Sequence, residues 1–332
     1  MAASTFGGKS LGLLGAIVLV PALGIGTARA VCPDDVCDCL GQAGQFAILG
    51  NTLIMQSGKQ SQSGSAYYFP SVTDTSVCAK TGKFSGKPGG ETEIGEDLLL
   101  TASSGLAATF KGYKYSGYSY EGVFIDGDLG TRGGTLKGLT CTSGTVGCDG
   151  PYAAVAGTTD TMAGNPRLPS CTQAMTDAQA ASTTLAALAP TQTFDKVIVK
   201  DQDTFDIDAG PGTNVISIGQ LTLKPQTYSG YAYGSFLSIN LQDDTDSVII
   251  NVGKLQVGSA CEIDVNGGDI ENVIINVPGP GSSVKIKNDA VVNAAILAPG
   301  RKVLAKRNTF VANLFGSDVK IQGANFESLL CP

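Results

Sequence analysis

Short apolar runs that alternate with polar residues dominate the chain after residue 190. The runs are rich in β-branched residues and are bounded by Gly, Pro, Asn or Asp, which is typical of strands and turns. They comprise Val197–Val199, Phe205–Ile207, Val215–Ile218, Leu221–Leu223, Leu237–Leu241, Val248–Val252, Ile263–Val265, Val273–Val277, Val284–Ile286, Ala295–Leu297 and Val319–Ile321. The pattern therefore predicts an all-β region, the main set of strands, over residues 194–326.

One internal repeat refines this prediction. The sequence Val-Ile-Ile-Asn-Val occurs at Val248–Val252 and again, unchanged, at Val273–Val277, 25 residues later. A coil of a parallel β-helix has about this length, and it buries its inward face only by stacking on its neighbours. A β-sandwich also has many short strands, but it does not readily explain identical strands one coil apart. We therefore predict a solenoid in which these two strands are parallel neighbours, with Val248 above Val273 and Ile250 above Ile275.

One segment has the spacing of a helix. Ala174, Ala178, Ala181, Leu185 and Leu188 recur at helical intervals. Ala and Leu favour helices and Pro190 would stop one. We predict a helix over residues 172–189.

The part of the chain before this helix has a different texture. Residues 39–139 are rich in Gly, Ser and Tyr, with short β-like runs only at 45–49, 97–100 and 123–125. The pattern predicts long Gly/Tyr-rich loops within residues 57–122. Residues 141–170 have the Gly and Thr content of an irregular insertion.

The first thirty residues have the order of a secretory signal. Lys9 precedes an apolar run, Leu11–Ile25, and Ala28-Arg29-Ala30 follows it as a cleavage site of small residues. A membrane anchor is the alternative, but the run is shorter than the ~20 residues that span a bilayer. We expect a signal peptide at residues 1–30 and one mature domain at residues 31–332, without a transmembrane segment, that is secreted, extracellular or on the cell surface.

Export would explain the cysteines. All nine lie in the expected mature part, at Cys32, Cys37, Cys39, Cys78, Cys141, Cys148, Cys171, Cys261 and Cys331. An oxidising compartment favours disulfides, and a metal site at Cys37 and Cys39 is the alternative. The flexible loop between Cys141 and Cys148 makes these two the best single pair, and the odd total leaves one thiol free or paired between chains.

Composition and charge exclude several functions. The 332 residues include no His, which removes Ser-His-Asp and Cys-His catalysis and His-ligated metals. The net charge is -7 and no block of basic residues occurs along the sequence. We therefore expect no nucleic-acid partner.

Several segments together resemble a known family. Gly41–Gly50 and Val123–Gly130 resemble the first coils of the choice-of-anchor A domain, and Glu271–Gly279, Ala294–Gly300 and Asn313–Val319 resemble its end. This bacterial family contains adhesins related to ice-binding-like β-helices. The resemblance covers roughly residues 40–326 and implies a right-handed parallel β-helix with one long helix packed alongside, no catalytic residues, and attachment to surfaces. Because Leu329–Pro332 adds no apolar tail, we expect release or non-covalent retention rather than wall anchoring.

Tyrosines are the first candidate site. Seven of the ten lie in two similar segments, at Tyr113, Tyr115, Tyr118 and Tyr120 and at Tyr228, Tyr231 and Tyr233. Clustered loop tyrosines suit contact with sugars or proteins, while the alternative is that the two segments pack on each other or line the helix end. The sequence favours an adhesin-like protein that binds an extracellular glycan or a matrix or surface protein, with little dependence on salt.

Acidic pairs are the second candidate. Asp126/Asp128 and Asp243/Asp244/Asp246 could supply oxygen ligands to calcium, as could Asp201/Asp203 and Asp206/Asp208. No complete calcium motif is present, and a solvated face or turn is the alternative. The same pairs leave open a β-helix enzyme that degrades polysaccharides. Ice binding is a further alternative, although Thr-x-Thr pairs occur without a 25-residue rhythm.

Overall fold

The computed structural model describes residues 40–56, 71–73, 76–86, 92–115, 118–120, 122–139, 145–149, 153–160, 166–307 and 309–327. The chain divides into two compact units, Met1–Val31 and Cys32–Pro332, and the described residues all belong to the second. The expected signal peptide at residues 1–30 lies outside them.

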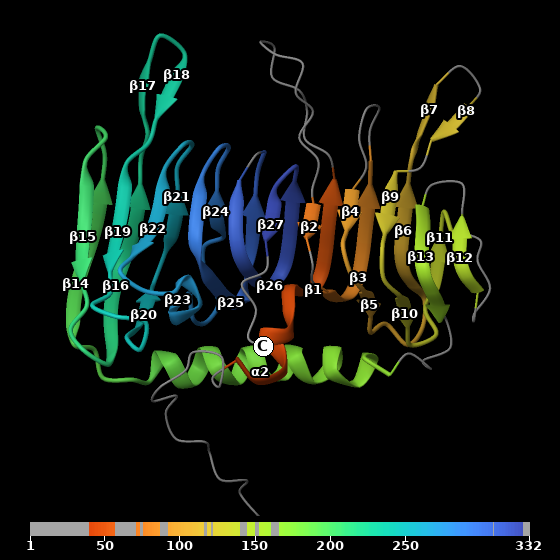
Figure 1. Ribbon diagram of the computed structural model, residues 1–332, viewed down its shortest axis with the longest axis horizontal. Coiled ribbons are helices and arrows are strands. Elements are labelled where there is room, and N and C mark those ends of the chain that lie inside the picture. Colours follow the sequence, from red (N-terminus) through yellow and green to blue (C-terminus); the bar gives the residue numbers. More distant parts are fainter. Residues whose placement is uncertain are drawn as a thin grey trace, which may run out of the picture. The chain divides into compact units, whose positions relative to one another are not determined.

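The second unit is a parallel β-helix (Figure 1). Within the described residues, 23 strands form one sheet whose pairings are parallel except for β12 with β13. Before the helix α2 (Leu168–Ala186) the elements are a 3-10 turn (Gly41–Gln45), β1 (Phe46–Gln56), β2 (Ser71–Thr73), β3 (Ser76–Ser85), β4 (Thr92–Ile94), β5 (Leu98–Leu100), β6 (Leu106–Lys111), β7 (Tyr113–Tyr115), β8 (Tyr118–Tyr120), β9 (Val123–Ile125), β10 (Leu129–Thr131), β11 (Thr135–Lys137), β12 (Thr145–Asp149) and β13 (Ala153–Asp160). After it come β14 (Gln192–Val199), β15 (Thr204–Asp208), β16 (Thr213–Leu223), β17 (Gln226–Tyr228), β18 (Tyr231–Tyr233), β19 (Phe236–Asn240), β20 (Ser247–Val252), β21 (Leu255–Val257), β22 (Glu262–Asn266), a 3-10 turn (Ile270–Asn272), β23 (Val273–Asn276), β24 (Val284–Ile286), β25 (Val291–Ala305), β26 (Phe310–Gln322) and β27 (Asn325–Glu327).

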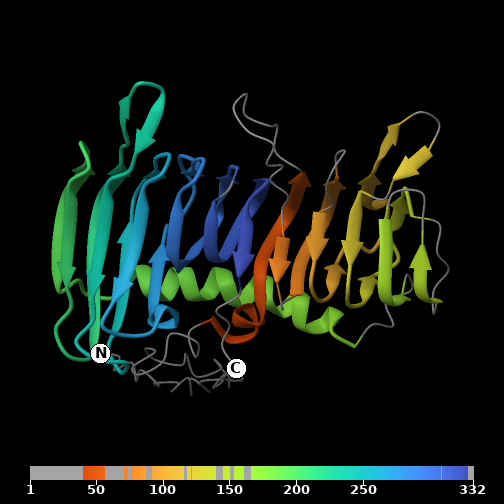
Figure 2. The same cartoon turned by 45° about the horizontal axis from the view of Figure 1, so that its top comes forward.

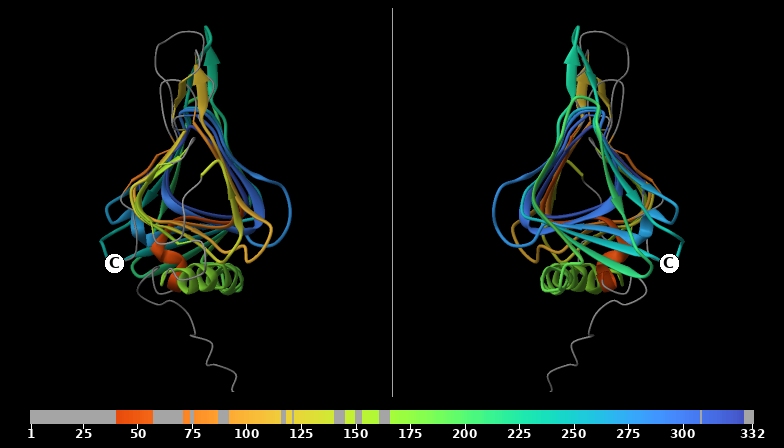
Figure 3. Two further views of the ribbon diagram at one scale, coloured as in Figure 1. Left: turned by 90° about the vertical axis from the view of Figure 1, so that its right-hand side faces the viewer. Right: turned by 90° about the vertical axis from the view of Figure 1, so that its left-hand side faces the viewer.

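Each coil turns through three faces, which enclose a triangular core (Figure 3). Face A contains β5, β20, β23 and the first parts of longer strands, and α2 covers it. Face B contains β6, β21, β24 and the last parts of those longer strands. Face C contains β4, β9, β15, β19 and β22. Strand β25 is long enough to contribute to all three faces, since it pairs with β22, β23 and β24 in turn.

The first strand of the solenoid, β1, lies in the middle of the stack (Figure 1). Strand β1 pairs on one side with β3 and on the other with β26, with Ile48 opposite Leu314 and Met55 opposite Ile321. The first coils grow from this centre to β12 and β13, α2 then runs back along the stack, and the remaining coils grow from β14 back to the centre (Figures 1 and 2). A 19-residue helix is about 28 Å long, which matches about six strand spacings. The helix therefore bridges both halves of the stack.

The predicted register of the repeat is confirmed. Val248 lies opposite Val273 and Ile250 opposite Ile275, in parallel strands. Val and Ile at these positions point into the central core, whereas Ile249 and Ile274 pack in the cluster beneath α2. Burial on both sides explains why the repeat is apolar at three successive positions.

The repeated asparagine also has a structural role. Asn276 Nδ2 donates to the carbonyl oxygen of Ser182 (2.9 Å) and to Asn251 Oδ1 (2.8 Å). Ser182 Oγ donates to Asn276 Oδ1 (2.7 Å), and Asn251 Nδ2 donates to the carbonyl oxygen of Leu185 (2.8 Å). The two copies of the repeat thus anchor the last turns of α2 to face A.

The predicted helix is present, but its bounds of 172–189 are shifted. The helix begins at Leu168, with a proline in its first turn, where a missing N–H costs nothing. It ends at Ala186, and the N–H of Ala187 bonds back to the carbonyls of Thr184 and Leu185. In the middle of the helix the buried side chains that face the sheet are small, at Ala174, Ala178 and Ala181, which lets the helix approach face A closely, and Leu168 and Leu185 are buried near its ends.

Two predictions of irregular structure are wrong. The region 57–122, expected to form long loops apart from the β-like run at 97–100, contains β2, β3, β4, β6, β7 and β8 besides β5, which lies in that run, and the region 141–170 contains β12, β13 and the start of α2. Core positions such as Val77, Phe84 and Phe110 lie among Gly, Thr and Lys residues. The residues next to these core positions point outward and are polar, and most strands here are short. Each strand therefore has too few apolar residues for the sequence pattern to indicate it.

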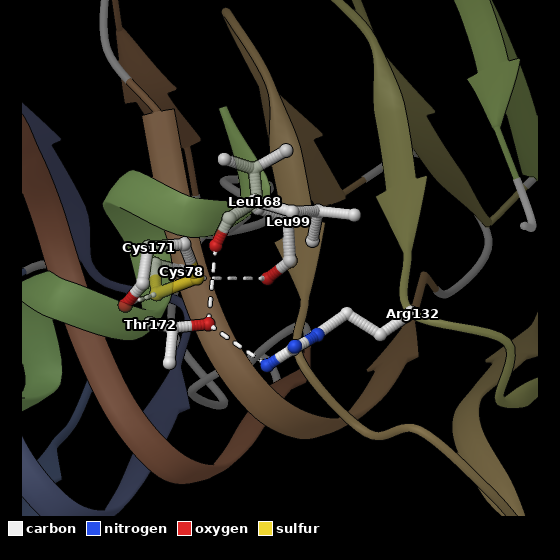
Figure 4. The surroundings of a disulfide bond; sticks show 6 residues. All are labelled: Cys78, Leu99, Arg132, Leu168, Cys171 and Thr172. Atoms are coloured by element: carbon white, nitrogen blue, oxygen red, sulfur yellow. Dashed lines mark hydrogen bonds between the residues drawn. A yellow bond between two sulfur atoms is a disulfide. The ribbon is translucent and has the colours of Figure 1, made fainter. Parts of the chain in front are cut away.

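The structure contains a disulfide that spacing did not indicate (Figure 4). Cys78 of β3 is bonded to Cys171 of α2, 93 residues apart in the chain. Next to it, Arg132 donates to Thr172 Oγ1 (3.5 Å), which donates to the carbonyl of Leu168 (3.1 Å). Cys261 is a buried free thiol, and burial raises its pKa. The predicted pair Cys141–Cys148 lies outside the described side chains.

Candidate functional site

The second tyrosine segment forms a hairpin that projects from the solenoid. Strands β17 and β18 pair only with each other, with Tyr228 opposite Tyr231 and Gln226 opposite Tyr233. Positive φ angles at Ser229 (50°) and Gly230 (84°) give the two-residue turn that matches the twist of such a ribbon. Directly opposite residues and residues two apart share one face of a ribbon. Tyr228, Tyr231 and Tyr233 therefore lie on one side, with Thr227 and Ala232 on the other.

These rings are unusually open to solvent. Tyr228 and Tyr231 are each 71% exposed and Tyr233 is 44% exposed. Burial of a large side chain with apolar surface normally stabilises a fold, and none of these three rings is buried against the described residues. The hairpin is available for contact with a partner.

The first tyrosine segment also pairs as two antiparallel strands. Strands β7 and β8 form an antiparallel hairpin in which Tyr113 is opposite Tyr120 and Tyr115 is opposite Tyr118; the side chains of these four lie outside the described residues. Both hairpins rise from the same edge of the solenoid, toward opposite ends of the stack (Figures 1 and 3). The alternative that the two segments pack on each other is therefore wrong.

The acidic candidates have structural partners. Asp246 is buried, and its carboxylate accepts the N–H groups of Gly212, Gln242 and Asp243 (2.6 to 3.1 Å). Asp243 Oδ1 accepts both the hydroxyl and the N–H of Thr245, and these bonds lower the pKa of Asp243. These residues therefore form a turn that is held by its own hydrogen bonds. Asn272 Nδ2 also donates to the backbone carbonyl of Asp244 (2.7 Å).

The other acidic pairs also include residues with local partners. Asp126 is exposed, while Asp128 Oδ1 accepts the N–H of Thr158 (2.6 Å). Asp201 forms an ion pair with Lys200 (3.2 Å). The backbone N–H of Asp203 donates to the carbonyl of Lys200 in the same turn. Among the described residues, no group of three or more His, Cys, Asp or Glu side chains is arranged to hold a metal ion.

Face C is a polar ladder. Asp206 and Asp208 of β15 lie in register with Ser238 and Asn240 of β19, and these with Asp264 and Asn266 of β22. Amide groups join the rows, because Asn240 donates to Asp208 (2.9 Å) and Asn266 donates to Asn240 (3.2 Å). Partial burial, together with the charge of Asp264, raises the pKa of Glu262 in the same strand. Face C is therefore acidic, and the amide side chains of Asn240 and Asn266 form hydrogen bonds with side chains of neighbouring strands.

Face B gathers lysines, which sequence reasoning missed. Its central row runs through ten strands in register, and its residues are Ile198, Thr222, Gln256, Lys285, Leu304, Lys320, Ile54, Lys83, Thr109 and Lys137. The four lysines come from strands scattered between residues 83 and 320, so no block of basic sequence signals them. The register of each strand was the information needed to find them.

Comparison with known proteins gives a family. The model of the family described as "Putative Ice-binding-like adhesive domain" matches residues 48–328. The chain belongs to this family. No curated protein matches it.

Solved structures give a weaker likeness. They include an ice-binding protein from the Antarctic ascomycete Antarctomyces psychrotrophicus, 14% identical with a TM-score of 0.47, over 90% of this chain and 100% of that chain. They also include the ice-binding protein LeIBP from an Arctic yeast, 14% identical with a TM-score of 0.46, over 88% and 94% of the two chains. The ice-binding protein 1 domain from Shewanella frigidimarina is 13% identical with a TM-score of 0.45, over 90% and 98%. At these values the likeness says nothing of what this member of the ice-binding-like adhesive family binds.

The family description names no enzyme. In the part of the chain that the structure describes, no helix is long and apolar enough to cross a membrane.

Proposed function

We propose that this member of the ice-binding-like adhesive family is a secreted or cell-surface adhesin-like protein without catalytic activity. The observation that carries the proposal is the hairpin β17–β18, which holds three exposed tyrosines on one side. Tyrosine offers a large contact area and a hydroxyl at a small entropic cost, which suits binding to glycans and proteins. An extracellular glycan or a matrix or surface protein is the proposed partner.

The narrower parts of this proposal rest on the sequence. They are a bacterial choice-of-anchor A domain, a cleaved signal at residues 1–30 and export to the surface. Calcium at Asp126, Asp128, Asp243, Asp244 and Asp246 stays a proposal from the sequence. The carboxylates of Asp246 and Asp243 accept internal hydrogen bonds.

Adhesion is favoured over the two alternatives by the surfaces themselves. Threonine occupies two of the ten positions of the central row of face B and lysine occupies four, so this row is not a regular threonine ladder. The acidic pairs are held in turns and ladders by backbone and amide partners. Thermal hysteresis of the purified chain would support the ice-binding alternative, and release of reducing sugars would support a hydrolase.

The test is surface attachment of the mature chain on a panel of glycans and matrix proteins. Tyr228→Ala with Tyr231→Ala should weaken binding by about 1 to 2 kcal/mol for each ring that is a hot spot. Thr227→Ala, on the other side of the same hairpin, is the matched control and should bind as the native chain does.

Two outcomes would count against the tyrosine account. Attachment that survives the double substitution would remove these rings from the contact. If attachment is instead lost when Asp126→Asn and Asp128→Asn are combined, the contact would be assigned to an acidic surface that binds its partner through a bridging cation. The tyrosine contact should depend only weakly on salt, because uncharged groups make it.

A further inference from the structure

The central row of face B has a regular charge spacing. From β24 onward its residues are Lys285, Leu304, Lys320, Ile54, Lys83, Thr109 and Lys137, so that a lysine occurs at every second strand. Neighbouring strands lie about 4.8 Å apart, which places successive lysines of the row about 9.6 Å apart. The row thus places four positive charges in register along face B.

The four lysines of the row reach the surface. Lys83, Lys137 and Lys285 are exposed and Lys320 is half-buried. In the part of the chain that the structure describes, none of the four forms an ion pair. Among the residues paired across face B, Asp318 is the one acidic side chain, and Lys302 lies opposite it. Face B is therefore positive although the whole chain carries a net charge of -7.

The spaces between the lysines are apolar or small. Leu304 and Ile54 alternate with Lys285, Lys320 and Lys83, and both are half-buried rather than hidden in the core. A sugar ring has an apolar C–H face that can lie on such side chains. The lysine ammonium is a compact point charge. It can bind an acidic group in many orientations, whereas the arginine guanidinium favours a planar, two-point contact. A row of this kind suits a chain of sugars in which acidic groups occur at intervals.

We propose that face B binds a linear acidic polysaccharide with one acidic group per disaccharide, laid along the solenoid axis across Lys285, Lys320, Lys83 and Lys137. The inference deepens the adhesive function proposed above, because it names a ligand class for a second surface of the same protein. Successive acidic groups of such a polymer lie two sugars apart, an interval comparable to that of the lysines.

Charge spacing favours this polymer over other polyanions. Duplex DNA carries one charge per about 1.7 Å of its axis, far denser than the row. A membrane presents a wide negative surface, and its attraction would be opposed by the acidic face C, where Asp206, Asp208 and Asp264 lie. A narrow polymer can contact face B alone.

The test is binding of the purified mature chain to hyaluronan, a linear polymer with one carboxylate per disaccharide, measured by calorimetry. We expect saturable binding that weakens about tenfold or more between ~50 and ~200 mM salt. Carboxyl-reduced hyaluronan, which keeps the sugar backbone and loses the charge, should not bind.

Substitutions locate the site. Lys83→Gln with Lys320→Gln should weaken binding by about tenfold or more, and Lys83→Arg with Lys320→Arg should retain it. Lys200→Gln is the control for lost charge, because Lys200 pairs with Asp201 outside the row and should be neutral for binding. Thermal unfolding of each variant shows whether the fold is kept.

The results separate this proposal from the tyrosine account. Hyaluronan binding that is unchanged in Tyr228→Ala with Tyr231→Ala, but lost in the lysine pair, supports a second site on face B. Binding that is unchanged in the lysine pair would overturn the proposal. So would equal or tighter binding of duplex DNA or of vesicles containing phosphatidylserine, since either would assign the face to another class of partner.

Discussion

At the scale of single residues, the repeated asparagine shows how one side chain can serve two purposes. Asn251 and Asn276 occupy the same position in successive coils, and their side chains bond to each other and to α2. The repeat in the sequence predicted the stacking of the strands correctly. It could not indicate that the helix accepts and donates hydrogen bonds at this position, because Ser182 and Leu185 are distant in the sequence.

Asn276→Ala should lower the free energy of unfolding by about 1 to 3 kcal/mol, because it leaves the buried Ser182 hydroxyl and carbonyl without their partner. The control is Asn266→Ala on exposed face C, which should change stability by no more than about 0.5 kcal/mol. Urea unfolding of the two variants gives the comparison. Equal stability of both would mean that the asparagine bonds do not hold the helix.

At the scale of elements, α2 is the component that ties distant coils together. Its small buried side chains pack on strands from both halves of the stack, including Leu49 of β1 and Ile249 of β20. The Cys78–Cys171 bond fixes its first turn to β3, and the asparagines fix its last turns to β20 and β23. The spacing of Ala and Leu along the sequence predicted the helix. It could not predict which strands the two ends of the helix contact, because those contacts join residues 66 to 94 positions apart.

Replacement of both Cys78 and Cys171 by Ala should reduce the free energy of unfolding by about 2 to 5 kcal/mol, because the bond closes a long loop in the unfolded chain. The measurement is denaturant unfolding under oxidising conditions. Cys261→Ala, which removes a buried thiol but no disulfide, is the comparison. An unchanged midpoint in the double variant would show that the disulfide does not contribute to stability.

At the scale of the whole molecule, the fold brings together what the sequence keeps apart. The stacking of β1 on β26 joins the first and last coils, and no repeat links Phe46–Gln56 with Phe310–Gln322 in the sequence. The same stacking aligns Ile54 between Lys320 and Lys83 and so completes the lysine row. The all-β class, the main strands and the tyrosine segments could be predicted from local patterns. The lysine row could not, because it exists only after every coil is in register.

The resulting scaffold has separate surfaces for separate tasks. Helix α2 covers face A, the acidic ladder occupies face C, face B holds the lysines, and the tyrosine hairpins project from one edge (Figures 1 and 3). We propose that the protein attaches to a surface through exposed groups on this frame and carries out no chemistry there.

The most direct test is chemical footprinting of the mature chain while it is attached to the panel surface that retains it best. Tyrosine iodination, read by mass spectrometry, should reach Tyr228 and Tyr231 in the free chain, where both are 71% exposed. The account predicts that attachment protects both rings by about tenfold or more, as expected for contacts at the centre of an interface. Equal iodination of both tyrosines in the free and attached chain would contradict it.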